Sequence, residues 1–276
     1  MKRKISLLLI VSFYTLALRA RDSAHWLDGV VRHNRGTATI MTDDPRPLWQ
    51  AVQALSEEYG WTIDYEDPLY SEADVVDRND AAFAASHPGI KQHVVAGGHF
   101  EMSFAEDQNI ALSVTEEKDV LQKLVTEYNK SNNPGKFTLI EEGGARFAVV
   151  GVNGSPRAVM DTPIRIDSDA ANGAFALQDV CDAVTSASGV KVLLMMYPLN
   201  LFAHERVDFS HASMPARDLL KQILDATTPR KLEYTVLYDL DDKTDHLSVM
   251  IVSKATTDTV TGRRMLEPVG TGQPRQ

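Results

Sequence analysis

Cysteine is almost absent from this sequence of 276 residues, in which Cys181 is the only one. A single cysteine cannot form a disulfide within the chain, and one thiolate is too few for a thiolate-bound metal cluster. No cysteine follows the apolar N-terminal segment, which excludes lipoprotein processing there. An exported protein with so little cysteine fits the bacterial envelope better than a secreted scaffold held together by disulfides.

Basic residues are also scarce. The chain has 28 lysines and arginines against 38 aspartates and glutamates, which gives a formal net charge of −10. Nucleic acids bind basic surfaces, and anionic lipid surfaces repel acidic proteins, so we expect neither as a partner. The ordinary role of such a charge is solubility.

Long apolar runs are limited to the N-terminus. Lys2, Arg3 and Lys4 precede an almost wholly apolar segment at 5–18, and small residues follow at Ala20 and Ala24. This order is typical of a secretory signal peptide, which we place at 1–24. An uncleaved membrane anchor is the alternative, although a bilayer span needs roughly 20 residues. No later run is long enough, so we expect no membrane span after the signal peptide is removed.

Apolar periodicity divides the rest of the chain into two similar halves. The order helix, strand, strand, helix, strand, strand is expected at 44–152 and again at 170–253. Short segments match between the halves: 61–63 with 190–192, 119–124 with 218–223, and 137–139 with 234–236. The alternative is that short α+β units look alike by chance. We predict a first module at 25–152, a linker at 153–169, a second module at 170–253 and a disordered tail at 254–276.

Local signals mark some boundaries within the first module. Pro47 is typical of a helix start and Gly60 of a helix end, while Ser113 and Glu116 form a capping box. Residues 25–43 are polar and weakly patterned. Residues 66–98 are rich in acids and contain two prolines, which suggests a long loop or an irregular insert.

The second half carries a recognisable series of motifs. They are ALQDV at 176–180, ASGVKV at 187–192, RVDF at 206–209, MPARDLL at 214–220 and LEY at 232–234. This series resembles the secretin and TonB short N-terminal domain and related secretin N-modules, and the first half resembles them more loosely at 48–65 and 119–124. The resemblance implies periplasmic modules that bind other envelope proteins by packing modules together or by pairing sheet edges. Such modules usually precede an outer-membrane channel, so this chain would be a stand-alone relative.

No motif assigns catalytic chemistry. Ser188-x-x-Lys191 matches one motif of penicillin-recognising enzymes and Ser131-x-Asn133 matches another, but their order is reversed and no Lys-Thr-Gly follows. Cys181 lies on the apolar stripe of its helix, where a free cysteine is ordinarily a small buried hydrophobe. Sequence alone leaves open a pair of carboxylates that folding brings together.

Metal-binding patterns are equally weak. His99 and Glu101 share one strand face near His93, but a third ligand and its supporting contacts are lacking, so a solvated strand face is the simpler interpretation. His204 and His211 have no motif context. The acidic run at 239–245 lacks the glycine and the glutamate of a calcium loop, which favours a charged hairpin turn. We assign no catalytic, cofactor-binding or metal residues and predict no cofactor.

The sequence therefore predicts an α+β fold of two tandem small modules, each with a three- to four-stranded sheet and two helices on one face. The expected function is a non-enzymatic protein-binding or assembly module of the bacterial cell envelope, periplasmic or secreted. Its expected partners are envelope proteins, such as a secretin or a TonB-dependent system, bound by strand addition or helix packing. The alternatives are an exported hydrolase or a small-ligand-binding protein with its site between the modules. A cleft that brings His99 and Glu101 to another acid would favour the hydrolase. The oligomeric state is left open.

Overall fold

The computed structural model describes residues 27–78, 81–106, 112–152, 158–167, 172–203, 207, 212–227 and 230–270. The predicted signal peptide at 1–24 lies outside these residues, and so do His204, His211 and most of the strand expected at 207–209. In the part of the chain that is described, no helix is long and apolar enough to cross a membrane.

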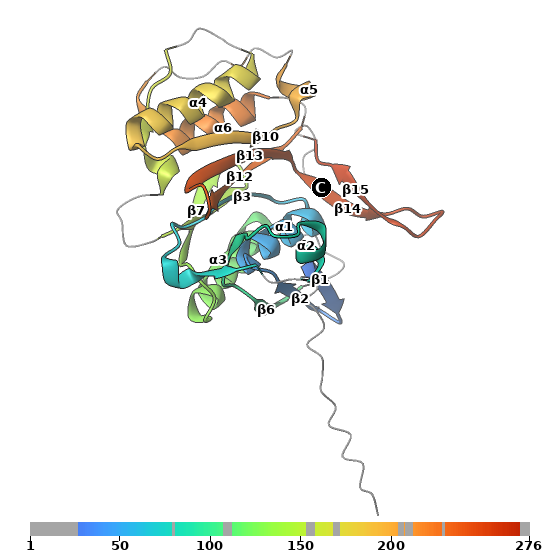
Figure 1. The fold of residues 1–276 in the computed structure, drawn as a ribbon. Helices are drawn as coiled ribbons and strands as arrows, with labels where there is room; N and C mark the ends of the chain where they lie inside the picture. The colour runs from blue at the N-terminus through green and yellow to red at the C-terminus, as the bar shows by residue number, and fades with distance from the viewer. Residues whose placement is uncertain are drawn as a thin grey trace, which may run out of the picture.

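The fold is α+β, as the sequence predicted, and it is arranged in four layers (Figure 1). A mixed six-stranded sheet lies in the middle. Helices α4 (Gly173–Ser188) and α6 (Ala216–Ala226) cover one of its faces, and α1 (Pro47–Tyr59) and α3 (Val114–Lys130) cover the other. The fourth layer is an antiparallel sheet of β1 (Leu27–Asn34), β2 (Thr37–Asp43) and β6 (His99–Ala105), packed on α1 and α3.

Both halves of the chain contribute to the central sheet. Its strands, in spatial order, are β10 (Val192–Met196), β13 (Thr244–Ile251), β12 (Leu232–Asp239), β3 (Thr62–Glu66), β8 (Arg146–Gly151) and β7 (Phe137–Gly143). In each half the first strand runs parallel to the last, and the last pairs antiparallel with the middle one. Strand β12 pairs in parallel with β3, so the halves build one sheet instead of the separate small sheets that we expected. The division into two modules of one design stays a prediction.

Two hydrophobic cores lie on opposite faces of this sheet. One is formed by α4 and α6 with β10, β12 and β13, and the other by α1, α3 and the three-stranded sheet with β3, β7 and β8. Alternation along β3 decides which side chains enter which layer. Ile63 and Tyr65 point into the second core, while Asp64 and Glu66 point to the opposite face, beneath α6.

Several predicted helix boundaries are confirmed. Pro47 occupies the first turn of α1, and Gly60 ends the helix in the left-handed conformation, with φ 70° and its N–H donated to Ser56 O. Ser113 and Glu116 form the capping box that starts α3. Each signal satisfies backbone groups that a helix end leaves without partners.

The polar segment at 25–43 forms strands β1 and β2, which the sequence analysis missed. The turn between them contains Arg35 and Gly36, both with positive φ, as tight hairpin turns require. Along β2, Ala38, Ile40 and Thr42 are buried on one face. Alanine and threonine differ little in hydropathy from the polar residues beside them, so the alternation has little contrast.

The prediction of a disordered tail at 254–276 is wrong for the described residues to 270. Strands β14 (Ser253–Thr257) and β15 (Arg264–Pro268) form a hairpin that projects from the sheet (Figure 1). Its end is held by backbone hydrogen bonds from Lys231 N to Val269 O (3.0 Å) and from Val269 N to Val252 O (2.8 Å). All of β15 is exposed, so no apolar alternation marks it in the sequence.

The remaining segments are short. The expected insert at 66–98 contains η1 (Glu72–Asp74), β4 (Val75–Asp77), α2 (Ala81–Ser86) and β5 (His93–Val95), with β4 and β5 paired. In the described part of the expected linker, η2 (Val159–Asp161) precedes β9 (Pro163–Ile164). Strand β9 pairs with β11 (Met214–Pro215), and α5 (Leu199–Phe202) follows β10.

Candidate functional site

The junction between the two halves contains buried ion pairs. Asp64 and Glu66 of β3 are 0% and 1% exposed. Arg146 Nη1 lies 3.1 and 2.8 Å from the two carboxylate oxygens of Asp64. Arg217 of α6 binds Glu66 through Nε and Nη2, at 2.8 and 2.9 Å. Because a buried charge is costly without its partner, these pairs fix β3 beneath α6.

Hydrogen bonds to β12 complete the junction. The backbone N–H of Tyr234 donates to Asp64 Oδ1 at 2.7 Å, and its hydroxyl donates to Glu66 Oε1 at 2.7 Å. On the other face, Ser56 of α1 donates to Glu233 Oε2 at 2.8 Å, and burial raises the pKa of Glu233 to about 8. These carboxyl groups are all bonded within the protein, so their role is to join the halves.

Glu142, near the end of β7, differs from its neighbours. Both of its carboxyl oxygens are buried and accept no hydrogen bond among the described residues. Arg217 Nε is 3.9 Å from Oε1. Burial, followed by the charge of Asp64, raises the pKa of Glu142 to about 8. The carboxyl group is therefore mostly protonated at pH 7.

A cleft of about 580 Å³ lies where β3 and β8 end. Much of its lining is apolar: Pro68, Leu69, Ile140, Val150, Val152, Val159 and Val190. Asp245 of β13 also lines it and is 7% exposed. Burial and the charges of Asp67 and Glu66 raise the pKa of Asp245 to about 7. A cleft of this size and lining is suited to a small molecule.

A second hollow, of about 340 Å³, lies beside Arg146 and Lys221. Arg146 already binds Asp64, and Lys221 Nζ donates to the backbone oxygen of Glu142. These two cations of the hollow are therefore bonded to protein oxygens.

Strand β7 is one edge of the central sheet, and the described residues place no strand on its outer side. Asn129 of α3 binds both backbone groups of Phe137: the Phe137 N–H donates to Oδ1 at 2.9 Å, and Nδ2 donates to Phe137 O at 2.7 Å. The backbone of Phe137 thus faces outward. Because backbone direction alternates along a strand, Leu139 also turns its N–H and C=O outward.

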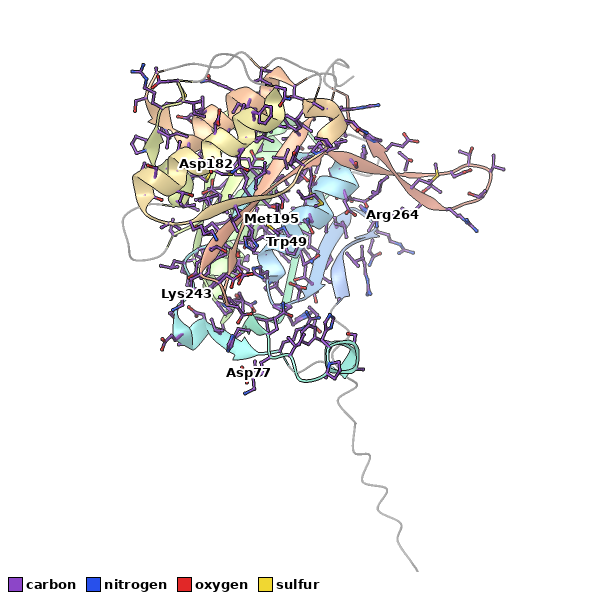
Figure 2. All side chains as sticks on the ribbon, turned by 45° about the horizontal axis from the view of Figure 1, so that its top comes forward. Trp49, Asp77, Asp182, Met195, Lys243 and Arg264 are labelled. Atoms are coloured by element: carbon purple, nitrogen blue, oxygen red, sulfur yellow. The ribbon has the colours of Figure 1, made fainter. Side chains whose placement is uncertain are left out.

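Strand β10 is the other edge and likewise has no strand on its outer side among the described residues. The Val192 N–H donates to Thr185 Oγ1 of α4 at 2.9 Å, so Val192 faces outward, and so does Leu194. Met195, labelled in Figure 2, and Met196 follow on the same strand and are 56% and 57% exposed. This edge combines unpaired backbone groups with exposed apolar side chains.

The candidate nucleophiles occupy structural positions. The Ser188 hydroxyl donates to Val184 O at the end of α4, and the Ser131 hydroxyl donates to Tyr128 O at the end of α3, both at 2.7 Å. Cys181 is fully buried, and burial raises the pKa of its thiol to about 12. A thiol in this environment is a poor nucleophile.

The histidines weighed as metal ligands are used elsewhere. His93 Nδ1 binds Asp241 at 2.5 Å, which ties β5 to the turn between β12 and β13, and His93 Nε2 lies 3.4 Å from Asp77. His99 and Glu101 are exposed on β6, with 3.8 Å between Nε2 and Oε2, in the outer sheet and away from the cleft. Across the described ranges, no group of three or more His, Cys, Asp or Glu side chains could hold a metal ion.

The acidic run at 239–245 forms a hairpin turn, as predicted. Asp239 Oδ1 accepts the N–H groups of Asp241 and Asp242, both at 2.9 Å. Asp245, at the end of this run, is one of the residues that line the cleft, which the sequence analysis did not anticipate. It also missed the junction pairs, because charged residues alternating on a strand ordinarily indicate a solvated face.

Comparisons of this chain with protein-family models, with curated proteins and with solved structures find no match.

Proposed function

We propose that this chain is a non-enzymatic protein-binding or assembly module of the bacterial cell envelope, which binds through the edges β7 and β10. The observation that supports this most directly is the pair of sheet edges with outward-facing backbone groups. The N-terminal pattern supports export to the periplasm or beyond. The motifs of the second half support kinship with secretin and TonB N-terminal modules, with envelope proteins as partners.

Strand addition explains what such edges can do. An extended segment of a partner can hydrogen-bond to the outward N–H and C=O groups of Leu139 or Leu194. Met195 and Met196, which are exposed beside Leu194, would become buried in the same step. Unprotected edges of this kind are normally avoided in soluble proteins unless something pairs with them.

In-cell crosslinking of the tagged chain, with mass spectrometry of envelope fractions, tests this function. We expect the wild type to capture an envelope assembly protein, and the double variant Met195→Lys, Met196→Lys to lose it. Phe175→Lys is the matched control, because Phe175 is 63% exposed on α4 and belongs to neither edge strand. Capture that is equal in all three proteins, or absent from the wild type, would contradict the proposal.

A second candidate function is the binding of a small molecule in the cleft, which the position of the nearly buried Asp245 in its apolar lining favours. An acid in an apolar lining suits an amphipathic amine. Calorimetric titration with hexylamine at pH 8 should show binding that Asp245→Asn abolishes. Equal binding by the variant, or none by the wild type, would remove this candidate.

A further inference from the structure

The junction between the two halves of the chain is itself formed by strand addition. The middle strand of the second half, β12, pairs in parallel with the first strand of the first half, β3. Thr235 lies opposite Tyr65 and Val236 opposite Glu66, and Asp67 N donates to Val236 O at 2.8 Å. The contact is heterologous, because it joins two different edges.

The two outer edges of the sheet are formed by the same two kinds of strand, a middle strand and a first strand, and the described residues place no further strand beside either of them. Strand β7 is the middle strand of the first half, and β10 is the first strand of the second half. The strand pairing relates these edges row by row: Val149 lies between Tyr65 and Leu139, and Leu247 lies between Leu194 and Val236. In the next row a bulge in β10 leaves Met195 unpaired and places Met196 opposite Ser248, as Glu66 lies opposite Val150. Leu139 therefore corresponds to Val236, and Leu194 corresponds to Tyr65.

We propose that β7 of one copy of this chain pairs in parallel with β10 of a second copy, in the register of the internal junction. Thr138 then lies opposite Leu194 of the second copy, and Leu139 lies opposite Met196, the residue that follows the bulge in β10. This inference rests on the proposed function and names its partner as a second copy. Because each copy keeps one free edge of each kind, the contact repeats head to tail and forms an open chain.

Backbone orientation supports this register. At the internal junction, Tyr234 N is bound by the Asp64 side chain, and Val236, two residues on, pairs with β3. On β7, Phe137 is bound by the Asn129 side chain, and Leu139, two residues on, faces outward. In both strands, a side chain therefore binds the backbone at the first of these residues. The backbone of the residue two positions later is left to pair with another strand.

Side-chain chemistry differs between the two junctions in a consistent way. The positions of Asp64 and Glu66 on β3 correspond to Leu193 and Met196 on β10. In the matched segments of the helices, Lys118 of α3 takes the place of Arg217 of α6. The contact between copies is therefore apolar where the internal one is ionic, and it covers Met196, which is 57% exposed in the single chain. A sheet that twists by about 20–25° per strand would turn by about 120–150° for each copy of six strands.

Disulfide trapping tests the contact residue by residue. Leu139→Cys protein is mixed with Met196→Cys protein under mild oxidation, and Cys181 stays in place because it is fully buried. The two positions lie on opposite edges of the sheet, so a disulfide between them forms only between copies. Leu139→Cys mixed with Phe175→Cys is the control. We expect mixed dimers in the first pair and not in the control.

Sedimentation velocity over a range of concentrations gives the second measurement. We expect dimers and longer species that grow with concentration, and a rise of about tenfold in the dissociation constant for Met196→Lys, an exposed position that leaves the fold intact. A monomer at every concentration, crosslinking equal to the control, or a closed dimer that links Leu139→Cys to itself would each overturn the proposal. If the edges capture a different envelope protein while the chain stays monomeric, this inference fails and the proposed function stands. If they capture nothing, both fail.

Discussion

Arg217→Met is expected to destabilise the protein strongly, because it removes the cation that pairs with Glu66 at the centre of the sheet. Glu66 is 1% exposed and would keep only the Tyr234 hydroxyl, 2.7 Å from Oε1, as a hydrogen-bond donor. Removing one member of a buried ion pair costs about 3–5 kcal/mol of the free energy of unfolding. Asp161, the other acid bound by Arg217, has a side chain that is 36% exposed, so its loss of a partner adds little.

Urea denaturation at pH 7, followed by circular dichroism, measures this loss. A total stability of about 5–15 kcal/mol is typical of a domain, so a loss of this size should lower the midpoint clearly. The double variant Glu66→Met, Arg217→Met should recover most of the loss, because it leaves no charge buried without its partner. Their difference gives a coupling energy that we expect to exceed about 2 kcal/mol.

Lys118→Met on α3 is the matched control. Lys118 binds Glu141 at 2.6 Å, but both side chains are about half exposed, so the change should leave the urea midpoint close to that of the wild type. A loss below about 1 kcal/mol for Arg217→Met, or a double variant no more stable than the single one, would refute the reasoning. Either result would mean that α6 does not press Arg217 against β3, and that the halves are not joined there.

Three further predictions concern pH, packing and the thiol. Glu142 has a pKa of about 8 in the folded protein, raised from 4.5, so the stability it contributes is full below about pH 4.5 and is lost as the pH rises toward 8. Urea midpoints at pH 6 and pH 9 should show this decline, and Glu142→Gln should flatten it. Gly151→Ala would place a Cβ 2.2 Å from Pro68 N and should cost about 1–3 kcal/mol by thermal unfolding, whereas Gly98→Ala, with nothing within 4 Å, should be neutral. Cys181 should resist Ellman's reagent at pH 8 and react fully once guanidinium chloride unfolds the chain; fast reaction of the native protein would contradict its burial.

Local rules predicted the parts of the fold that depend on neighbouring residues. Gly60 and the Ser113–Glu116 box mark helix ends by satisfying backbone groups within a few residues, so the sequence alone is sufficient there. Strands β14 and β15 are held by backbone bonds such as Lys231 N to Val269 O, which involve distant residues and leave no trace in side-chain pattern. The expectation of disorder failed for that reason.

The junction shows the same limit at the candidate site. Thr62, Asp64 and Glu66 alternate with apolar residues, and this pattern identifies correctly the face of β3 that turns away from its own helices. It cannot tell whether that face meets water or a second layer. The answer depends on Arg146 and Arg217, which lie 82 and 151 residues from Asp64 and Glu66 along the chain. On β10, Leu193 and Met196 occupy the corresponding positions without any acid. The polar side chains that alternate along β3 are buried in a contact that the sequence pattern did not reveal. By the same reasoning, the apolar side chains at the exposed end of β10 indicate a contact that one copy of the chain does not make by itself.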